Sequence, residues 1–247
     1  MKDCVVLGQS WVAQGVAKAL ETSPVPLERA REHKDPAVVF HADICPNLDD
    51  PLFMWTWLIQ TLATRQYFAK SHWIQHSPAE VLAGAGYVRP YTPTAEIRPH
   101  GLIGQVMGSL EWGLTSLGYS LAIVRTSLLY SGVPNSLIDW AERTIRQGMG
   151  RVNHQLFNPT PIGPFATYVD YLVDTKRTGI YHVASRGGPA SFEDVLHFLC
   201  DCWLLPMPIL EVEEEPLVNL CLRTTPILEH WQFEMARFLE EHLTNLD

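Results

Sequence analysis

The chain has 247 residues, with 27 acidic and 18 basic side chains, a formal net charge of -9 and 47% hydrophobic residues. It is too long for a miniprotein that depends on disulfides, too apolar for a disordered chain and short for two full domains. The acidic balance, without a dense cluster of lysines and arginines, argues against a nucleic-acid binder, which needs cations to neutralise phosphates.

Five cysteines are scattered along the chain without the paired spacing of a zinc site. The histidines do not match a metal-binding motif either, so no metal site is predicted. The N-terminal apolar run is too brief for a secretion signal, and the longest apolar run, residues 52–62, is too short to span a bilayer. We therefore expect a cytoplasmic protein with reduced thiols and no membrane contact.

Apolar strand-like runs and helical periodicities alternate along the first two thirds of the chain. Strands are predicted at residues 4–7, 25–27, 37–41, 73–74, 121–124 and 179–183, and helices at 12–20, 52–69, 101–117, 136–147, 165–174, 192–204 and 233–243. This alternation is typical of βαβ units and predicts an α/β fold with a doubly wound, parallel, Rossmann-like sheet. Residues 1–150 would form a nucleotide-binding-type domain, and residues 151–247 a smaller C-terminal α+β substrate-type subdomain interleaved with the first.

The stretch between Leu20 and Ala37 holds only one short strand-like run. A complete nucleotide-binding half has a strand, a helix and a further strand there. Because the third strand of such a sheet lies at its edge, it can be lost without opening the core. We therefore predict a sheet that is trimmed at one edge.

The first strand runs into a turn that reads Gly8-Gln-Ser-Trp-Val-Ala-Gln-Gly15. A dinucleotide fingerprint has glycines here because the pyrophosphate approaches bare backbone at a helix N-terminus. Trp11 instead puts an indole where the phosphates would pass. Two interpretations stay open: a purely structural turn, or a cofactor site formed by Gly8, Ser10, Trp11 and Gly15 with Arg29 and Arg31 beyond the second strand.

Four segments of the second half of the chain share a family pattern: LAIVRTSLLY at residues 121–130, NHQLFNPT at 153–160, TGIYHVA at 178–184 and SFED at 191–194. In order and spacing they resemble the dTDP-4-dehydrorhamnose reductase group of extended short-chain dehydrogenases. The resemblance continues upstream at residues 36–42 and 89–92 and covers most of the chain. It implies NAD(P) as the one candidate cofactor and a nucleotide or nucleotide-sugar as the candidate ligand.

The resemblance also implies a catalytic threonine, and a tyrosine and a lysine four residues apart. The tyrosine hydroxyl would protonate the carbonyl that the cofactor reduces, and the lysine would lower the pKa of that hydroxyl. Those positions fall on Pro78, Ile103 and Met107. None of these side chains can donate a proton or carry a charge, so the chain resembles a degenerate reductase. The substrate-side positions of the group match Arg125, Ser127, Asn135, Gln155, Pro159 and Thr160.

Other side chains offer alternative chemistry. Glu80 and Glu111 could form a carboxylate pair, although the simpler interpretation places Glu111 on a helix surface and Glu80 in a turn. Ser127, His182 and Asp170 could be combined into a hydrolase triad, but no G-x-S-x-G elbow presents the serine.

Residues 52–62 are apolar almost all round, which is unusual for a surface helix. In relatives, as the resemblance implies, this helix and the helix at 101–117 pair with their copies in a second subunit. We therefore expect a homo-oligomer or hetero-oligomer through the 52–69 and 101–117 helices. Met54, Trp55 and Trp57 would be its anchors unless they pack internally.

Three functions follow from these patterns. The leading hypothesis is a catalytically silent member of the group, a binding, scaffold or regulatory subunit that could keep a nucleotide or nucleotide-sugar site. The second is an NAD(P)-dependent nucleotide-sugar reductase or epimerase with displaced catalytic residues. The third is a nucleotide-sugar binder without a cofactor.

Overall fold

The structure is a computed structural model that describes residues 2–44, 47, 49–85, 89–134, 136–213, 217–224 and 228–243. Its centre is a six-stranded sheet, all parallel, in the order β10-β5-β4-β3-β1-β2. The strands are β1 (Cys4–Leu7), β2 (Pro24–Val25), β3 (Val38–His41), β4 (His72–Pro78), β5 (Leu121–Thr126) and β10 (Gly179–Val183). The predicted α/β fold with a doubly wound sheet is confirmed.

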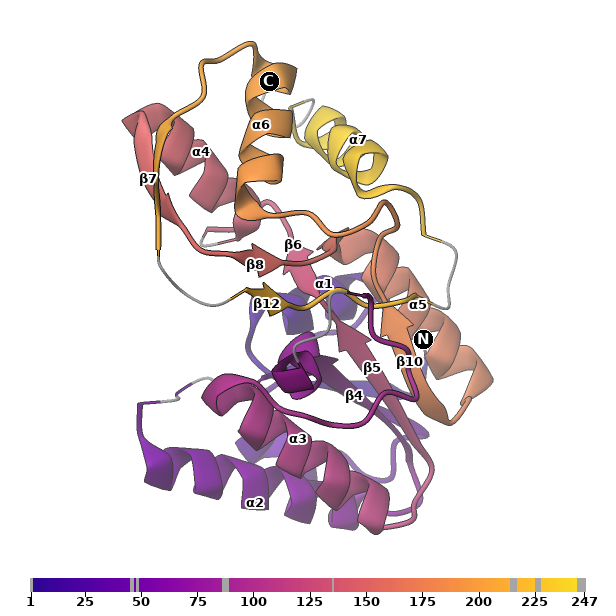
Figure 1. Cartoon of the computed structure of the whole chain (residues 1–247). Coiled ribbons are helices and arrows are strands. Elements are labelled where there is room, and N and C mark those ends of the chain that lie inside the picture. The colour runs from indigo at the N-terminus through magenta and orange to yellow at the C-terminus, as the bar shows by residue number, and fades with distance from the viewer. Residues whose placement is uncertain are drawn as a thin grey trace.

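Two pairs of helices cover the sheet, one on each face (Figure 1). On one face α1 (Trp11–Ala19) packs against α5 (Ile162–Thr175), and on the other α2 (Pro51–Tyr67) packs against α3 (Gly101–Ser116). Alternate strand residues therefore enter separate cores: Val6 joins the α1 and α5 core, and Leu7 joins the α2 and α3 core. Burial on both faces explains why these strands read as continuous apolar runs.

The sheet ends at β2, which pairs with β1 over only two residues. A short 3-10 helix, η1 (Leu27–Glu32), then leads towards β3. The segment between α1 and β3 thus holds one minimal strand and one short 3-10 helix, as expected for a sheet trimmed at this edge.

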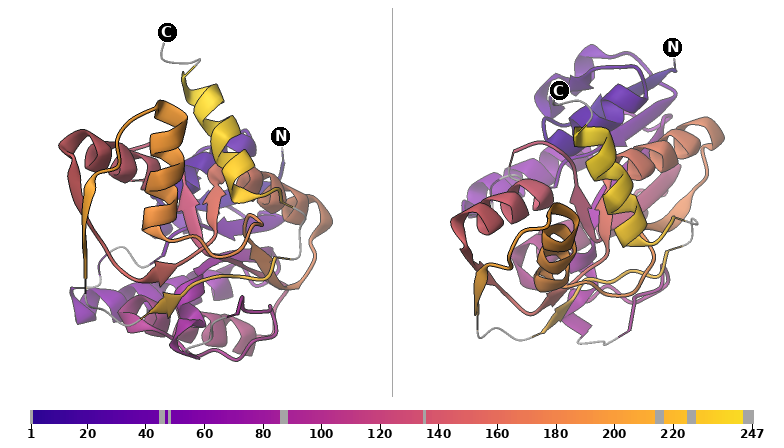
Figure 2. Two further views of the ribbon diagram at one scale, coloured as in Figure 1. Left: turned by 45° about the horizontal axis from the view of Figure 1, so that its top comes forward. Right: turned by 90° about the horizontal axis from the view of Figure 1, so that it is seen from above.

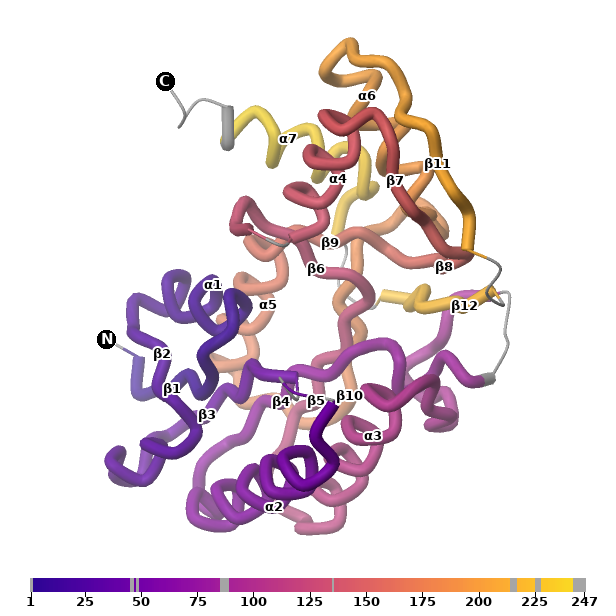
Figure 3. Tube along the Cα trace, turned by 90° about the vertical axis from the view of Figure 1, so that its left-hand side faces the viewer, coloured from indigo at the N-terminus to yellow at the C-terminus, as the bar shows by residue number. Residues whose placement is uncertain are grey.

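The remaining elements lie beyond the carboxyl ends of the sheet strands, where α4 (Leu137–Gln147), α6 (Phe192–Trp203) and α7 (Trp231–Leu243) group together (Figures 2 and 3). Six short strands join them in parallel pairs: β6 (Leu128–Tyr130) with β9 (Pro159–Pro161), β7 (Met149–Val152) with β11 (Ile209–Val212), and β8 (Gln155–Leu156) with β12 (Val218–Asn219). The division of the chain at residue 150 stays a prediction.

Three of the cysteines, Cys4, Cys200 and Cys221, are buried free thiols, and Cys202 is an exposed one. Cys45 lies outside the described residues. Within the described ranges, no helix has both the length and the apolar character needed to cross a membrane.

Candidate functional site

The turn between β1 and α1 directs its backbone N–H groups at a carboxylate of the protein itself. The Asp43 side chain accepts hydrogen bonds from the Gln9 N–H at 2.9 Å and from the Ser10 N–H at 3.1 Å, one on each oxygen. The Ser10 hydroxyl oxygen accepts a further bond from the Ala13 N–H at 3.3 Å and caps α1. Three backbone N–H groups at this helix start, those of Gln9, Ser10 and Ala13, are therefore engaged within the chain.

Parallel pairing of β1 with β3 brings Asp43 to this turn. The register places Leu7 opposite His41, and the Ala42 N–H donates to the Leu7 carbonyl at 2.9 Å. Gly8 has a φ of +133°, and a Cβ on it would lie 2.4 Å from Oδ1 of Asp43. Glycine at this position is what lets the carboxylate reach the backbone. Sequence reasoning missed Asp43; its signal is a charged residue just after a buried strand that borders the first one.

Gly15 and Trp11 are explained by the packing of α1. A Cβ on Gly15 would lie 2.6 Å from Cγ1 of Ile162, so this glycine allows α1 and α5 to approach each other closely. The half-buried Trp11 side chain packs against the core between these helices and the sheet.

Two arginines beyond the second strand are predicted to bind a cofactor. Arg29 and Arg31 instead contact side chains on the surface of η1 and α2. The Arg29 guanidinium pairs with the Glu32 carboxylate at 2.7 Å, which raises the pKa of Arg29 and lowers the pKa of Glu32. The Arg31 guanidinium lies over the Tyr67 ring, 5.6 Å from its centroid. Of the six predicted cofactor residues, only the four from Gly8 to Gly15 share one turn and helix.

The positions matched to catalytic residues carry apolar side chains at the end of β4 and on the first half of α3. Pro78 is the last residue of β4 and is buried. Ile103 is half-buried and Met107 is fully buried, and both pack in the core under α3. The start of α3 is held against the residues after β4, because the His100 N–H donates to the Glu80 carbonyl at 2.8 Å.

Glu111 and Arg125 form a buried ion pair, and each side chain is 1% exposed. Arg125 donates from Nε to Oε1 of Glu111 at 3.0 Å and from a terminal nitrogen to Oε2 at 2.6 Å. The expectation that Glu111 lies on the helix surface is wrong, because it faces β5, where Arg125 supplies the opposite charge. Glu80 lies in a 3-10 turn, as expected, and burial raises the pKa of its carboxyl.

The predicted substrate-side residues lie on neighbouring elements, and two of their hydroxyl groups join those elements. The Asn158 N–H donates to the Ser127 hydroxyl at 2.9 Å. The Thr160 hydroxyl donates to the Asn158 carbonyl at 3.1 Å and accepts from the Ser185 N–H at 3.0 Å. Pro159 pairs with β6, and Gln155 is half-buried in β8. Asn135 lies outside the described residues.

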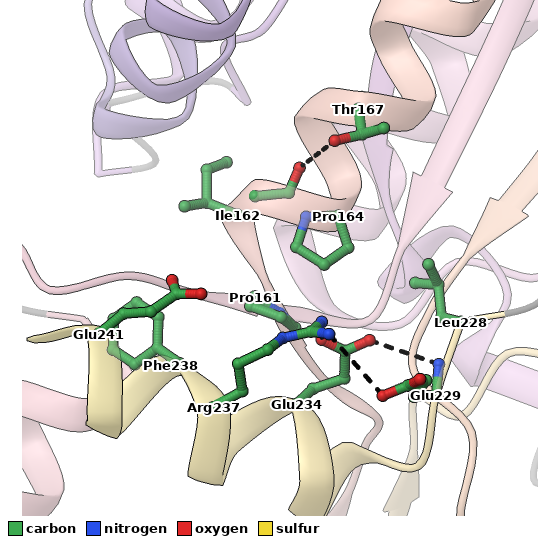
Figure 4. Close-up of a pocket in the computed structure, with 11 residues that line it drawn as sticks. Pro161, Ile162, Pro164, Thr167, Leu228, Glu229, Glu234, Arg237, Phe238 and Glu241 are labelled. Carbon is green, nitrogen blue, oxygen red and sulfur yellow. Dashed lines mark hydrogen bonds and ion pairs between the residues drawn. The ribbon is translucent and has the colours of Figure 1, made fainter.

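A cavity of about 670 Å³ opens between the start of α5 and α7 (Figure 4). Its lining comprises Pro161, Ile162, Gly163, Pro164, Thr167, Leu228, Glu229, Glu234, Arg237, Phe238 and Glu241. Arg237 forms ion pairs with Glu234 and Glu229. With three glutamates and one arginine, this lining carries an excess of negative charge, which disfavours an anionic ligand. Sequence reasoning missed the cavity because the final helix carries no motif.

The hydrolase triad is not assembled. The His182 Nδ1–H donates to the Tyr91 carbonyl at 3.1 Å, and Asp170 pairs with Lys2. Burial lowers the pKa of His182 to about 4, so it is neutral at physiological pH. Among the residues that the structure describes, no group of three or more histidine, cysteine or acidic side chains could hold a metal ion.

A family model described as the RmlD substrate binding domain matches residues 58–199, more than half of the chain. The chain belongs to this family. It is an RmlD-like member of the extended short-chain dehydrogenases, as the sequence pattern predicts. In a sequence comparison with curated proteins, nothing matches.

Solved structures share the RmlD-like fold. A dTDP-4-dehydrorhamnose reductase from Clostridium acetobutylicum matches with a TM-score of 0.81 at 17% identity, covering 98% of this chain and 100% of that one. The Bacillus anthracis enzyme, solved in complex with NADP, gives 0.83 at 16% identity with the same coverage. WbmG of Bordetella bronchiseptica, solved with NAD, gives 0.76 at 13% identity, covering 90% of this chain and 85% of that one. At these identities the likeness shows the fold.

The β1–α1 turn of this RmlD-like chain does not fit a dinucleotide in the arrangement described. In this class of fold the pyrophosphate binds the N–H groups of that turn. Here the Gln9 and Ser10 N–H groups bind Asp43, and phosphates on the same donors would lie against its carboxylate.

Proposed function

We propose that this chain is a catalytically silent RmlD-like protein that acts as a binding or scaffold subunit. The observation that carries the proposal is the apolar packing at Pro78, Ile103 and Met107. Reduction of a carbonyl needs an acid to protonate the oxygen and a nearby cation to lower the pKa of that acid. A proline, an isoleucine and a buried methionine supply neither.

The substrate-side groups also support a structural role. Arg125 is held by Glu111, and the Ser127 and Thr160 hydroxyls bond to backbone groups of neighbouring segments. A ligand at these residues would have to replace bonds that hold the elements together, and buried polar groups left unpaired are costly.

The scaffold role is supported by an exposed apolar face on α2 and α3. Trp55 is 61% exposed and Trp112 is 73% exposed, and they flank a groove of about 660 Å³ between the two helices. We propose that a second copy of this chain covers the face. Protruding indoles and a groove occur on the same surface. In a dimer with a twofold axis, the indoles of each copy could therefore enter the groove of the other copy. Met54 and Trp57, the other predicted anchors, are buried in the chain's own core.

The test is a turnover assay joined to a size measurement. Purified protein is mixed with NADPH or NADH and a dTDP- or UDP-4-keto sugar, and the absorbance of the reduced nicotinamide is followed. We expect no substrate-dependent loss of absorbance, and a dimer by light scattering. Sustained, substrate-dependent oxidation of the cofactor would establish the alternative, a nucleotide-sugar reductase with displaced catalytic residues. A monomer would refute the scaffold proposal for this face.

A further inference from the structure

We propose that Asp43 is a built-in substitute for the phosphates of a dinucleotide and makes this chain reject such ligands. This inference rests on the proposed function. If the chain is catalytically silent, the Asp43 carboxylate gives a physical reason why it would not hold a cofactor. It concerns binding alone and assigns Asp43 no part in a reaction.

The first step is the match between the carboxylate and a phosphate group. Both are anions with several oxygen acceptors, and both are suited to a helix start that presents unpaired N–H donors. Asp43 uses its two oxygens on the Gln9 and Ser10 N–H groups at 2.9 and 3.1 Å. The bare backbone at Gly8, which in a dinucleotide site admits pyrophosphate, here admits the Asp43 side chain.

The second step is the cost of exchange. A phosphate that took these donors would break two charge-assisted hydrogen bonds and would bring its own negative charge against the displaced carboxylate. The predicted cationic helpers do not offset it, because Arg29 is paired with Glu32 and Arg31 lies over Tyr67.

The third step is access. Gln9 is exposed, while Ser10 and Asp43 are half-buried, so a ligand in solution can reach the turn. Asp43 also follows the end of β3 and belongs to a connecting segment, not to the sheet itself. Rejection therefore depends on the carboxylate and its charge, and removal of that charge should open the site.

The experiment compares Asp43→Ala and Asp43→Asn with the unmodified chain and with Asp201→Asn as a matched control. Asp201 is exposed on α6, so its substitution changes the net charge equally without touching the turn. NADPH and inorganic pyrophosphate are titrated separately. The readouts are the tryptophan fluorescence, to which Trp11 in this turn contributes, and the melting temperature. Labelled amides of Gln9 and Ser10 report by NMR whether the ligand binds at this turn.

We expect Asp43→Ala to bind NADPH and pyrophosphate at least about tenfold more tightly than the unmodified chain, a gain of about 1.4 kcal/mol, with shifts of the two amides. Asp201→Asn should behave like the unmodified chain. Equal affinity in the unmodified chain and both Asp43 variants, or absence of binding in all of them, would overturn the proposal. If Asp43→Ala does not fold, Asp43→Asn decides, because it keeps one acceptor and loses the charge.

The turnover assay and the titrations together tell the failure of one proposal from the failure of the other. Turnover by the unmodified chain would refute both proposals, because it requires the dinucleotide to bind. A silent chain whose dinucleotide affinity does not respond to Asp43 would refute only this inference.

Discussion

The Glu111 and Arg125 side chains depend on each other because both lie out of contact with water. We expect Glu111→Gln to lower the free energy of unfolding by about 3–5 kcal/mol, since it leaves the Arg125 charge buried without its partner. Urea unfolding measures the change. The matched control is Glu32→Gln, which breaks an exposed pair with Arg29 that water and salt screen, and it should leave the stability nearly unchanged. An equal change in the free energy of unfolding for the two variants would contradict the claim that Arg125 needs the Glu111 charge.

At the same scale, the residues that sequence patterns missed are those whose partners come from a distant strand. Asp43 meets Gln9 only because β1 and β3 pair in one register, and neither residue belongs to a local motif. Glu111 lies on a helix with apolar residues and glycines on several sides, so its buried face could not be recognised without β5 in place. By contrast, the positions of Pro78, Ile103 and Met107 follow from spacing within a family pattern.

At the scale of elements, the close approach of α1 and α5 gives a prediction with an unusual sign. Glycine to alanine inside a helix normally stabilises it by about 0.5–1 kcal/mol. Gly15→Ala should instead destabilise the protein by about 1–3 kcal/mol, because its Cβ would lie 2.6 Å from Ile162. Thermal or urea unfolding measures this. Gly163→Ala, with open space around its Cβ, is the control, and Ile162→Ala in the Gly15→Ala background should recover part of the loss. Failure of that rescue would count against the contact.

Most elements could be predicted because each carries its own local signal. The parallel strands are buried on both faces and appear as short apolar runs, and helices such as α1 and α6 begin at the serine caps Ser10 and Ser191. The short pairs β7 with β11 and β8 with β12 could not be predicted, because each strand is brief and its partner lies far along the chain. The cavity between α5 and α7 escaped for the same reason, since it depends on where the last helix packs.

At the scale of the whole molecule, the exposed face of α2 and α3 predicts how copies associate. Trp112→Glu should convert the proposed dimer to a monomer, because a charge would be buried where an indole now fits the partner. Light scattering over a range of concentrations measures the mass. Phe233→Glu is the control, since Phe233 is 71% exposed but lies on α7. A dimer that survives Trp112→Glu, or dissociates equally with Phe233→Glu, would place the interface elsewhere.

The short strand β2 limits the addition of strands from other molecules at the edge of the sheet. An open sheet edge offers unpaired N–H and C=O groups to which a strand of another molecule can add, and this is a common route to aggregation. Here the edge strand is only Pro24 and Val25; Pro24 has no N–H, and Pro26 follows. The Val25 carbonyl faces the other way, towards the end of β1, and accepts a bond from the Gly8 N–H at 2.9 Å. The short edge strand therefore leaves a margin that resists further strand addition, which is consistent with the proposed association through helix surfaces.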